Sequence, residues 1–132
     1  MSVESLLYAR LAATAGVTAL FGAAPRIYPA KVPQGAALPH GRFVRVATER
    51  PKTFTASPGL SSAEFQVDIW ATTSAGAKAG ADAVRQALDY WIDRTAGVHG
   101  ALVDGENADF EEDREEDRCM LMVTVHTQGI DA

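Results

Sequence analysis

Two segments of the chain alternate between apolar and other side chains. In 63–70 every odd-numbered residue is apolar and every even-numbered residue is polar except Trp70, and in 119–126 the odd positions are again apolar. Because successive side chains of a strand point to opposite faces of a sheet, this period of two predicts two long strands, each with one buried face. Met120 and Met122 make the other face of the second strand partly apolar.

Apolar residues at helical spacing predict two helices. The first begins after Ser2, a residue type that caps helices, and stops at Gly16, after which 17–21 adds one apolar turn. The second begins at Thr73 or Ser74 and is ended by Gly97 and Gly100. Its apolar stripe comprises Ala77, Ala81, Val84, Leu88 and Trp91, and its polar side pairs Lys78 with Asp82 and Arg85 with Asp89 at i,i+4.

Three shorter segments rich in β-forming residues, 26–28, 42–49 and 101–103, complete the predicted elements. The polar, proline-containing stretch 50–60 is typical of a long hairpin loop. The resulting order α-β-β-β-α-β-β predicts an α+β fold in which two helices cover a small, mostly antiparallel sheet. The length of 132 residues suits one domain over 1–132. Edge strands favour pairing with further copies, so we expect an oligomer.

The charge of the chain is unevenly distributed. Twelve Lys and Arg against 17 Asp and Glu give a net charge of −5, and residues 1–60 are basic whereas 61–132 are acidic. The basic footprint of a nucleic-acid-binding protein is missing, so we expect no tight DNA binding. No apolar run approaches the roughly 18 residues that span a bilayer, and the N-terminal residues lack the basic flank of a secretory signal. We therefore expect a soluble protein that neither enters a membrane nor is exported.

Seven acidic residues are crowded just before the last predicted strand: Asp109, Glu111, Glu112, Asp113, Glu115, Glu116 and Asp117. We call these seven the acidic run. Three interpretations stay open: a solvated loop, a charged surface in a subunit contact or facing DNA in the lumen of a ring, and a divalent cation site. For the last, the glycine in 104–109 is at the wrong position for an EF-hand loop.

Few side chains point to catalysis or metal binding. His40, His99 and His126 lie far apart in the sequence, without the spacing of a metal-ligand motif. Cys119 is on the apolar face of a predicted strand, where a free cysteine behaves as a small hydrophobic residue. Nucleophile-elbow, phosphate-loop and dinucleotide-binding motifs are absent from the sequence. We expect no catalytic residues, no metal and no cofactor, and a protein that is not an enzyme.

Several features mark positions at which copies of the chain could meet. Trp70 either is tucked under a loop or anchors a contact, since tryptophan is enriched at interfaces. The loop 50–60 is either a disordered surface hairpin or an arm that orders on assembly, and its basic residues could meet the acidic run of a neighbouring copy. The hypothetical subunit interface comprises Arg50, Lys52, Phe54, Trp70, Met120 and Met122.

Taken in order, several segments resemble the tail terminator (tail completion) family of long-tailed phages, prophages and gene transfer agents. They are the leucine-rich opening helix, Ala19-Leu20-Phe21-Gly22, Arg26-Ile27-Tyr28-Pro29, the turn-rich 32–39, the strand 65–70, the helical 81–88 and the acidic segment before the last strand. The sequence departs from the family pattern at His40-Gly41-Arg42, and its acidic run is denser. These departures bear on the local register of the strands.

The resemblance implies a homohexameric ring that caps the tail tube, stops its polymerisation and offers its other face to the head connector. The implied place is a virion or phage-like particle assembled in the bacterial host cytoplasm. The implied partners are further copies of the chain, the tail tube protein and the head–tail connector or neck protein, while DNA passes through without specific binding. Two alternatives stay open: another neck or connector component of the same fold, and, from a different class, an acidic binding or inhibitor module or a small enzyme.

Overall fold

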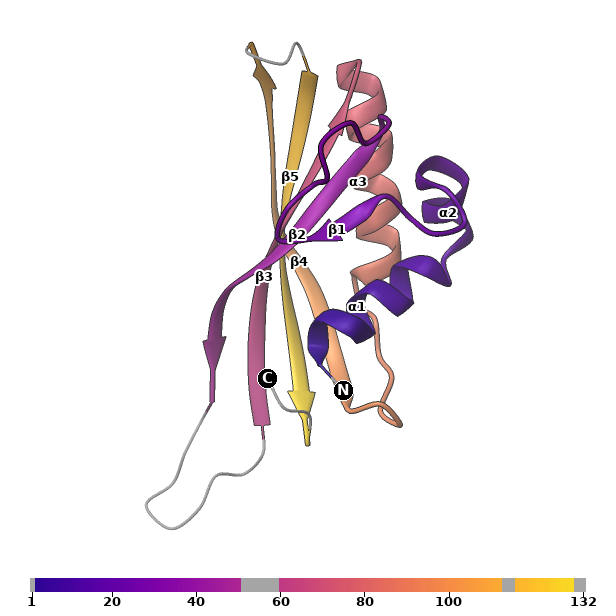
Figure 1. Cartoon of the computed structure of the whole chain (residues 1–132). Helices are drawn as coiled ribbons and strands as arrows, with labels where there is room; N and C mark the ends of the chain where they lie inside the picture. The colour runs from indigo at the N-terminus through magenta and orange to yellow at the C-terminus, as the bar shows by residue number, and fades with distance from the viewer. Residues whose placement is uncertain (1, 51–59, 113–115, 130–132) are drawn as a thin grey trace.

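The computed structural model describes residues 2–50, 60–112 and 116–129, and within these ranges three helices cover one face of a five-stranded sheet (Figure 1). The helices are α1 (Val3–Ala12), α2 (Ala15–Phe21) and α3 (Ser74–Leu88). The strands are β1 (Ile27–Pro29), β2 (His40–Glu49), β3 (Leu60–Ala71), β4 (Val98–Glu111) and β5 (Glu116–Gln128). The α+β class is confirmed, with one more helix than predicted. No helix in the described ranges is long and apolar enough to cross a membrane.

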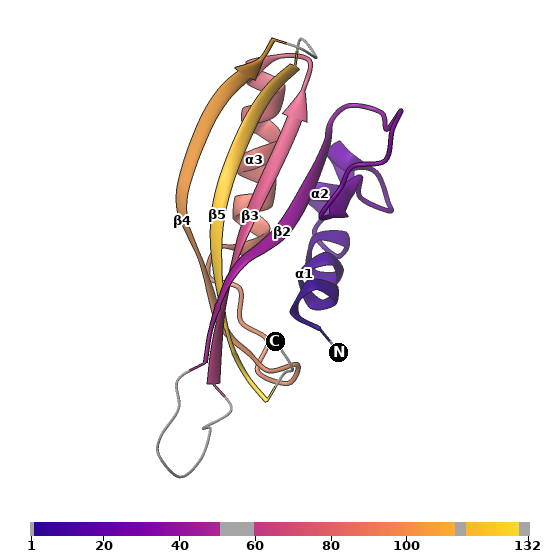
Figure 2. The ribbon, with the colours of Figure 1, turned by 60° about the vertical axis from the view of Figure 1, so that its left-hand side comes forward.

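The strands lie in the order β1-β2-β3-β5-β4. β1 runs parallel to β2, and the other neighbours are antiparallel, so the prediction of a mostly antiparallel sheet is confirmed. β3 and β5 pair along their whole length, from Leu60 with Gln128 at one end to Ala71 with Asp117 at the other. We call these the Gln128 end and the Asp117 end of the sheet. Figure 2 shows the long strands curving together beside the helices.

The predicted period of two places the core where expected. On β3, Phe65, Val67 and Ile69 are fully buried beneath the helices, and the alternating apolar residues of β5 are buried in the same way. The helices add large buried side chains to this cluster, namely Leu7, Leu11, Phe21, Val84 and Leu88. The opposite face of the sheet, which we call the open face, carries none of the described helices (Figure 2).

Both predicted helix starts are confirmed by their caps. The hydroxyl of Ser2 accepts a hydrogen bond from the backbone N–H of Ser5 at 3.1 Å, and that of Thr73 accepts from Gly76 N–H at 3.0 Å. Each bond satisfies one of the N–H groups that a helix start leaves without a partner.

The predicted end of the second helix is wrong, because α3 stops at Leu88 and does not reach Gly97. Asp89 is extended, and Tyr90 has a positive φ of 62°. The carboxylate of Asp89 accepts from Val103 N–H at 3.1 Å, and Tyr90 N–H donates to the carbonyl of Ala101 at 2.8 Å. Asp89 and Tyr90 therefore bond to β4, and the helix ends before them. Trp91 is buried but lies outside the helix, and Asp82 replaces Asp89 as the partner of Arg85.

α3 approaches the sheet most closely at Gly80. A Cβ atom added to Gly80 would lie 2.8 Å from Cγ2 of Ile69 on β3 and 3.0 Å from Cζ of Phe21 on α2. Those separations are shorter than an ordinary carbon contact of about 3.5–4.0 Å. The missing side chain therefore lets three elements meet at one point.

We predict that Gly80→Ala lowers the free energy of unfolding by about 1–3 kcal/mol, because the added methyl group overpacks this contact. Gly16→Ala is the matched control, since nothing lies within 4 Å of its added Cβ in α2. That change should stabilise the chain by up to about 1 kcal/mol through helix propensity. Denaturant unfolding measures both, and equal stabilisation of the two variants would contradict the close packing at Gly80.

Candidate functional site

Four charged side chains from four neighbouring strands meet on the open face. They are Arg42 on β2, Asp68 on β3, Arg118 on β5 and Asp109 on β4, and we call them the charge belt. Arg42 Nε lies 2.9 Å from Asp68 Oδ2, and Arg118 Nη1 lies 3.9 Å from Asp68 Oδ1. Arg118 also donates to both oxygens of Asp109, at 3.0 and 2.7 Å. The belt alternates in sign and ties the strands together across the sheet.

Asp68 is the centre of the charge belt. Its side chain is fully buried, whereas those of Arg42 and Arg118 are 36% and 27% exposed. Gln66 donates to its two oxygens at 3.2 and 3.1 Å. A carboxylate removed from water is tolerated only when hydrogen bonds and opposite charges compensate for its lost hydration. The side chains of the charge belt are therefore held in one arrangement by these bonds.

Asp109 lies at the exposed end of the belt. The hydrogen bonds from Arg118 hold the pKa of its carboxyl below the ordinary value. The pair has the two parallel N–H···O bonds typical of an arginine fork, which adds direction to the charge attraction. Since half of the Asp109 side chain is in water, this pair contributes more to geometry than to stability.

Trp70 lies on the open face, as its place in the alternation predicted, but only 5% of it is exposed. The ring of His40 packs against it at 5.7 Å between centroids, and the guanidinium of Arg42 lies 5.7 Å from its centroid. These two neighbours belong to β2, so Trp70 is buried against strand side chains, an arrangement that neither interpretation predicted. Trp70 therefore offers little surface of its own to a partner.

The two methionines of the predicted interface occupy the middle of the open face. Met120 pairs with Asp68 on one side and Asn107 on the other, while Met122 pairs with Gln66 and Gly105. Both side chains are half-buried. A flexible thioether between polar neighbours can adapt to the shape of a partner surface.

The acidic run does not form one solvated loop, because strands continue into it from both sides. Asp109 and Glu111 belong to β4, and Glu116 and Asp117 belong to β5. Glu112 is in the turn, and Asp113 and Glu115 lie outside the described residues. The strands extend this far because Ala108 and Phe110 keep the period of two opposite Cys119 and Asp117. The described residues of the run thus lie where β4 ends and β5 begins, at the Asp117 end of the sheet.

Arg50, the described basic residue of the predicted interface, lies at the other end. Arg50 directly follows β2, whose last residue, Glu49, pairs with Ser62 near the Gln128 end. Lys52 and Phe54 lie outside the described residues. The predicted meeting of these basic residues with the acidic run therefore requires a second copy of the chain.

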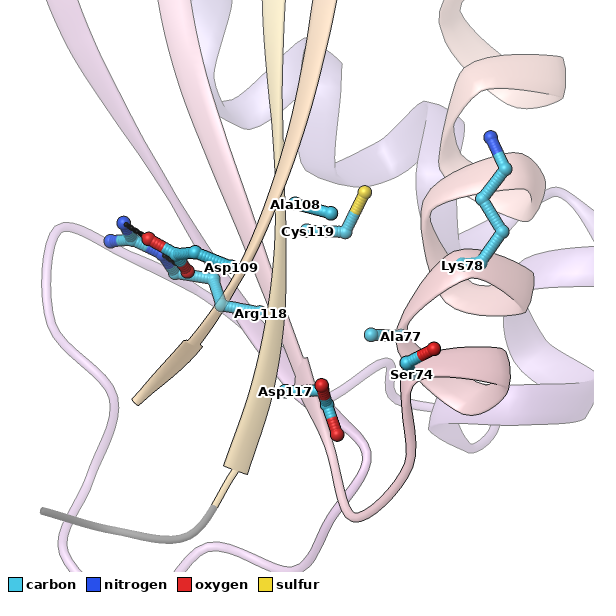
Figure 3. Close-up of a pocket in the computed structure, with 8 residues that line it drawn as sticks. All are labelled: Ser74, Ala77, Lys78, Ala108, Asp109, Asp117, Arg118 and Cys119. Carbon is cyan, nitrogen blue, oxygen red and sulfur yellow. Dashed lines mark hydrogen bonds and ion pairs between the residues drawn. The ribbon is translucent and has the colours of Figure 1, made fainter. Parts of the chain in front are cut away.

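A cavity of about 380 Å³ lies between the start of α3 and the β4–β5 hairpin (Figure 3). Figure 3 shows Cys119 directed toward α3, whereas Arg118 and Asp109 turn to the other side of the strands. Ala77, Ala108 and Cys119 give the cavity an apolar wall. Burial raises the pKa of the Cys119 thiol, which keeps it protonated and disfavours its use as a nucleophile.

Lys78 stands beside this cavity but is already paired. It bonds Glu106 on β4, and its Nζ lies 3.2 Å from Asp82 Oδ1. The hydrogen bonds that Lys78 donates to Glu106 and Asp82 raise the pKa of its ammonium group. The cavity therefore combines small apolar side chains with a neutralised ion pair, a lining that suits an apolar side chain of a partner better than a reacting substrate.

The three histidines lie far apart in the sequence, but two of them are close together in the structure. His99 and His126 line the same hollow near the Gln128 end, where His126 Nδ1 lies 2.9 Å from the Ser62 hydroxyl. His40 is buried near the Asp117 end against Trp70. Across 2–50, 60–112 and 116–129, no group of three or more His, Cys, Asp or Glu side chains is placed to hold a metal ion.

Comparison with known proteins adds a family and a fold. Residues 5–128 match the model of a family described as tail completion protein gp17. The fold is similar to that of a chain in the virion of a native gene transfer agent particle, with a TM-score of 0.76 and 21% sequence identity. This similarity covers 97% of the present chain and 96% of that chain. Curated protein sequences contain no match to the chain.

We predict that Asp68→Asn destabilises the chain by about 1–3 kcal/mol, because two guanidinium groups lose their shared counter-charge. Asp109→Asn is the matched control on the same belt, and its side chain is 52% exposed. Its loss of stability should be clearly smaller, because an exposed ion pair contributes little. Denaturant unfolding of both variants measures the difference, and equal losses would mean that Asp68 is not the centre of the belt.

Proposed function

Because the chain belongs to the tail completion protein gp17 family, we propose that copies of it form a ring, with six copies as the expected number, that caps a phage-like tail tube. The ring ends tail polymerisation and presents its other side to the head–tail connector. The chain thus has a structural role in a phage-like particle and does not act as an enzyme. The observation that carries the proposal is the family match over 5–128, which runs from within α1 to the last residue of β5.

The surfaces described above support such a role. A capping subunit needs contacts with its own copies, with the tube and with the connector, and these contacts need side chains held in place before assembly. The charge belt supplies fixed side chains on the open face, and the half-buried Met120 and Met122 supply adaptable apolar area beside it. The likeness to a chain of a gene transfer agent virion supports the fold required for this role.

The acidic side chains suit passage of DNA without capture. Glu49 and Glu64 belong to the open face, where the belt pairs Arg42 and Arg118 with Asp68 and Asp109, and the described acidic residues Glu116 and Asp117 lie at the start of β5. A wall with negative charge repels phosphates, whereas a basic wall would retain them by releasing counterions. If the open face borders the bore of the ring, DNA therefore moves past it without specific binding.

We predict that the purified chain does not bind double-stranded DNA at about 0.15 M salt, as measured by fluorescence anisotropy. A variant with Glu49→Lys and Glu64→Lys reverses two charges of the open face and should gain binding that weakens as salt rises. Tight DNA binding by the unmodified chain at this salt concentration would contradict passive passage.

Deletion of the gene should yield particles with overlong tails or tails without heads, because nothing stops the tube or joins it to the connector. Electron microscopy of tail lengths measures the effect, and expression of the unmodified chain from a plasmid should restore normal particles. Tails of normal length without heads would favour another connector component of the same fold. Normal particles in the deletion strain would refute a role in completing the tail.

A further inference from the structure

The sheet has two edges, and each is covered over only half of its length. On the β2 edge, β1 pairs with 41–43, where Gly41 N–H donates to Arg26 O and Ala30 N–H donates to Phe43 O, both at 2.8 Å. No other strand of the described chain pairs with β2 on that side. The remaining residues, 44–49, form the β2 half-edge.

The β4 edge is covered at its opposite half. Asp93 and Val98 exchange two backbone hydrogen bonds, and Ala101 and Val103 receive the contacts from Tyr90 and Asp89 described above. Beyond Val103, β4 is the outermost strand of the described sheet. The remaining residues, 104–111, form the β4 half-edge.

The two half-edges lie at opposite ends of the sheet and run in opposite directions. The β2 half-edge lies toward the Gln128 end and the β4 half-edge toward the Asp117 end, on opposite sides of the sheet. β2 and β4 run in opposite directions because each is antiparallel to its neighbour in the order β2-β3-β5-β4. Unpaired strand edges are templates for further strands, and two copies related by rotation would place them antiparallel.

Charge decides which half-edges can pair. The β4 half-edge carries Asp104 together with Glu106 and Asp109, which are paired with Lys78 and Arg118, so the charge of Asp104 disfavours the pairing of two such edges. The β2 half-edge has one acidic residue, Glu49, and one basic residue, Arg45, whose charge is paired with Glu4 of α1. An acidic edge facing a less acidic one favours a head-to-tail contact over a symmetric contact of β4 with β4.

From these observations we propose that the β4 half-edge of one copy adds to the β2 half-edge of the next, so that the sheets join head to tail into a continuous ring wall. This proposal rests on the ring proposed above and assigns the surface by which its copies join. Head-to-tail contacts of this kind generate closed rings when the rotation between copies closes. β1 and the segment 89–93 bound the contact on either side and thereby restrict its register.

The offset between the half-edges is compatible with closure. The register places Ala47 beside Glu64 of β3, whereas Asn107 lies level with Asp68 of β3, four residues further along. A shift of about one residue per strand across the four long strands is the stagger of a closed barrel with strands tilted by roughly 36°. A flat, unstaggered continuation of the sheet would not bring the two half-edges together.

Cross-linking tests the contact. Ala47 and Asn107 are exposed, belong to the open face and lie on the two half-edges. The double variant Ala47→Cys, Asn107→Cys, treated with a short bismaleimide, should give a ladder of covalently joined copies, both in purified oligomers and in particles from the complemented deletion strain. The unmodified chain should give none, because its only cysteine, Cys119, is buried.

Three matched variants control for chance encounters. Each single variant should give no ladder, and neither should Ala47→Cys with Leu102→Cys, because Leu102 is exposed on the covered half of β4. Restoration of normal tails by each variant shows that it folds and assembles. Dimers of Asn107→Cys alone would show symmetric pairing of β4 and overturn the head-to-tail contact.

The outcome separates this proposal from the proposed function. If the chain is present in particles with normal tails and the double variant gives no ladder, the joining of half-edges is wrong, while the capping role stands. If deletion leaves normal particles, the capping role is wrong whatever the cross-linking shows.

Discussion

The backbone groups at the rim of the sheet need hydrogen-bond partners, and this requirement shapes much of the chain outside the core. It accounts for β1, a strand of three residues whose pairing satisfies one half of the β2 edge. It also accounts for the end of α3, since Asp89 and Tyr90 leave the helix to bond Val103 and Ala101 on β4. Both segments cover an edge only in part, so the same requirement leaves two stretches of backbone available to a further copy.

The open face meets a second requirement, which is to hold charges at the centre of a sheet without losing stability. The buried charge of Asp68 is compensated by Arg42, Arg118 and Gln66, and Arg118 also binds Asp109. Because these side chains come from four strands, the network resists sliding of one strand past its neighbour. A subunit that joins others through strand edges depends on such a fixed register, since a slip by one residue would turn every side chain to the other face.

The sequence predicts those parts of the fold that depend on local pattern. β3 and β5 follow from their period of two, and the starts of α1 and α3 follow from Ser2 and Thr73, because burial and capping act over a few residues. The end of α3 escapes prediction, since distant β4 groups compete for Asp89 and Tyr90. The extension of β4 through Glu111 was not predicted either. The many charged residues there make the alternation of Ala108 and Phe110 hard to recognise in the sequence.

Of the charge belt, only Asp109 was among the residues predicted from the sequence, because the meeting of Arg42, Asp68 and Arg118 depends on strand pairing. The position of Trp70 on the open face follows from the alternation, but its burial depends on His40 and Arg42, which register alone brings beside it. Asp68 is noticeable in the sequence as an acidic residue in the middle of a predicted strand. Its partners on β2 and β5 become known only when the pairing of the strands is known. Lys52 and Phe54 lie outside the described residues, and their place in the interface stays a prediction.

The fold gives the acidic run a different structural interpretation from the one that its sequence suggests. As a loop it would be a solvated surface, whereas its described residues belong to the end of β4 and the start of β5, next to an edge of the sheet. Like charges gathered along a strand edge are unfavourable in an isolated sheet, so their presence needs a benefit elsewhere. Repulsion between two β4 edges supplies one, because it disfavours aggregation and symmetric dimers while leaving a less acidic edge as the acceptable partner. The uneven charge of the chain thereby bears on assembly through the direction in which copies can join.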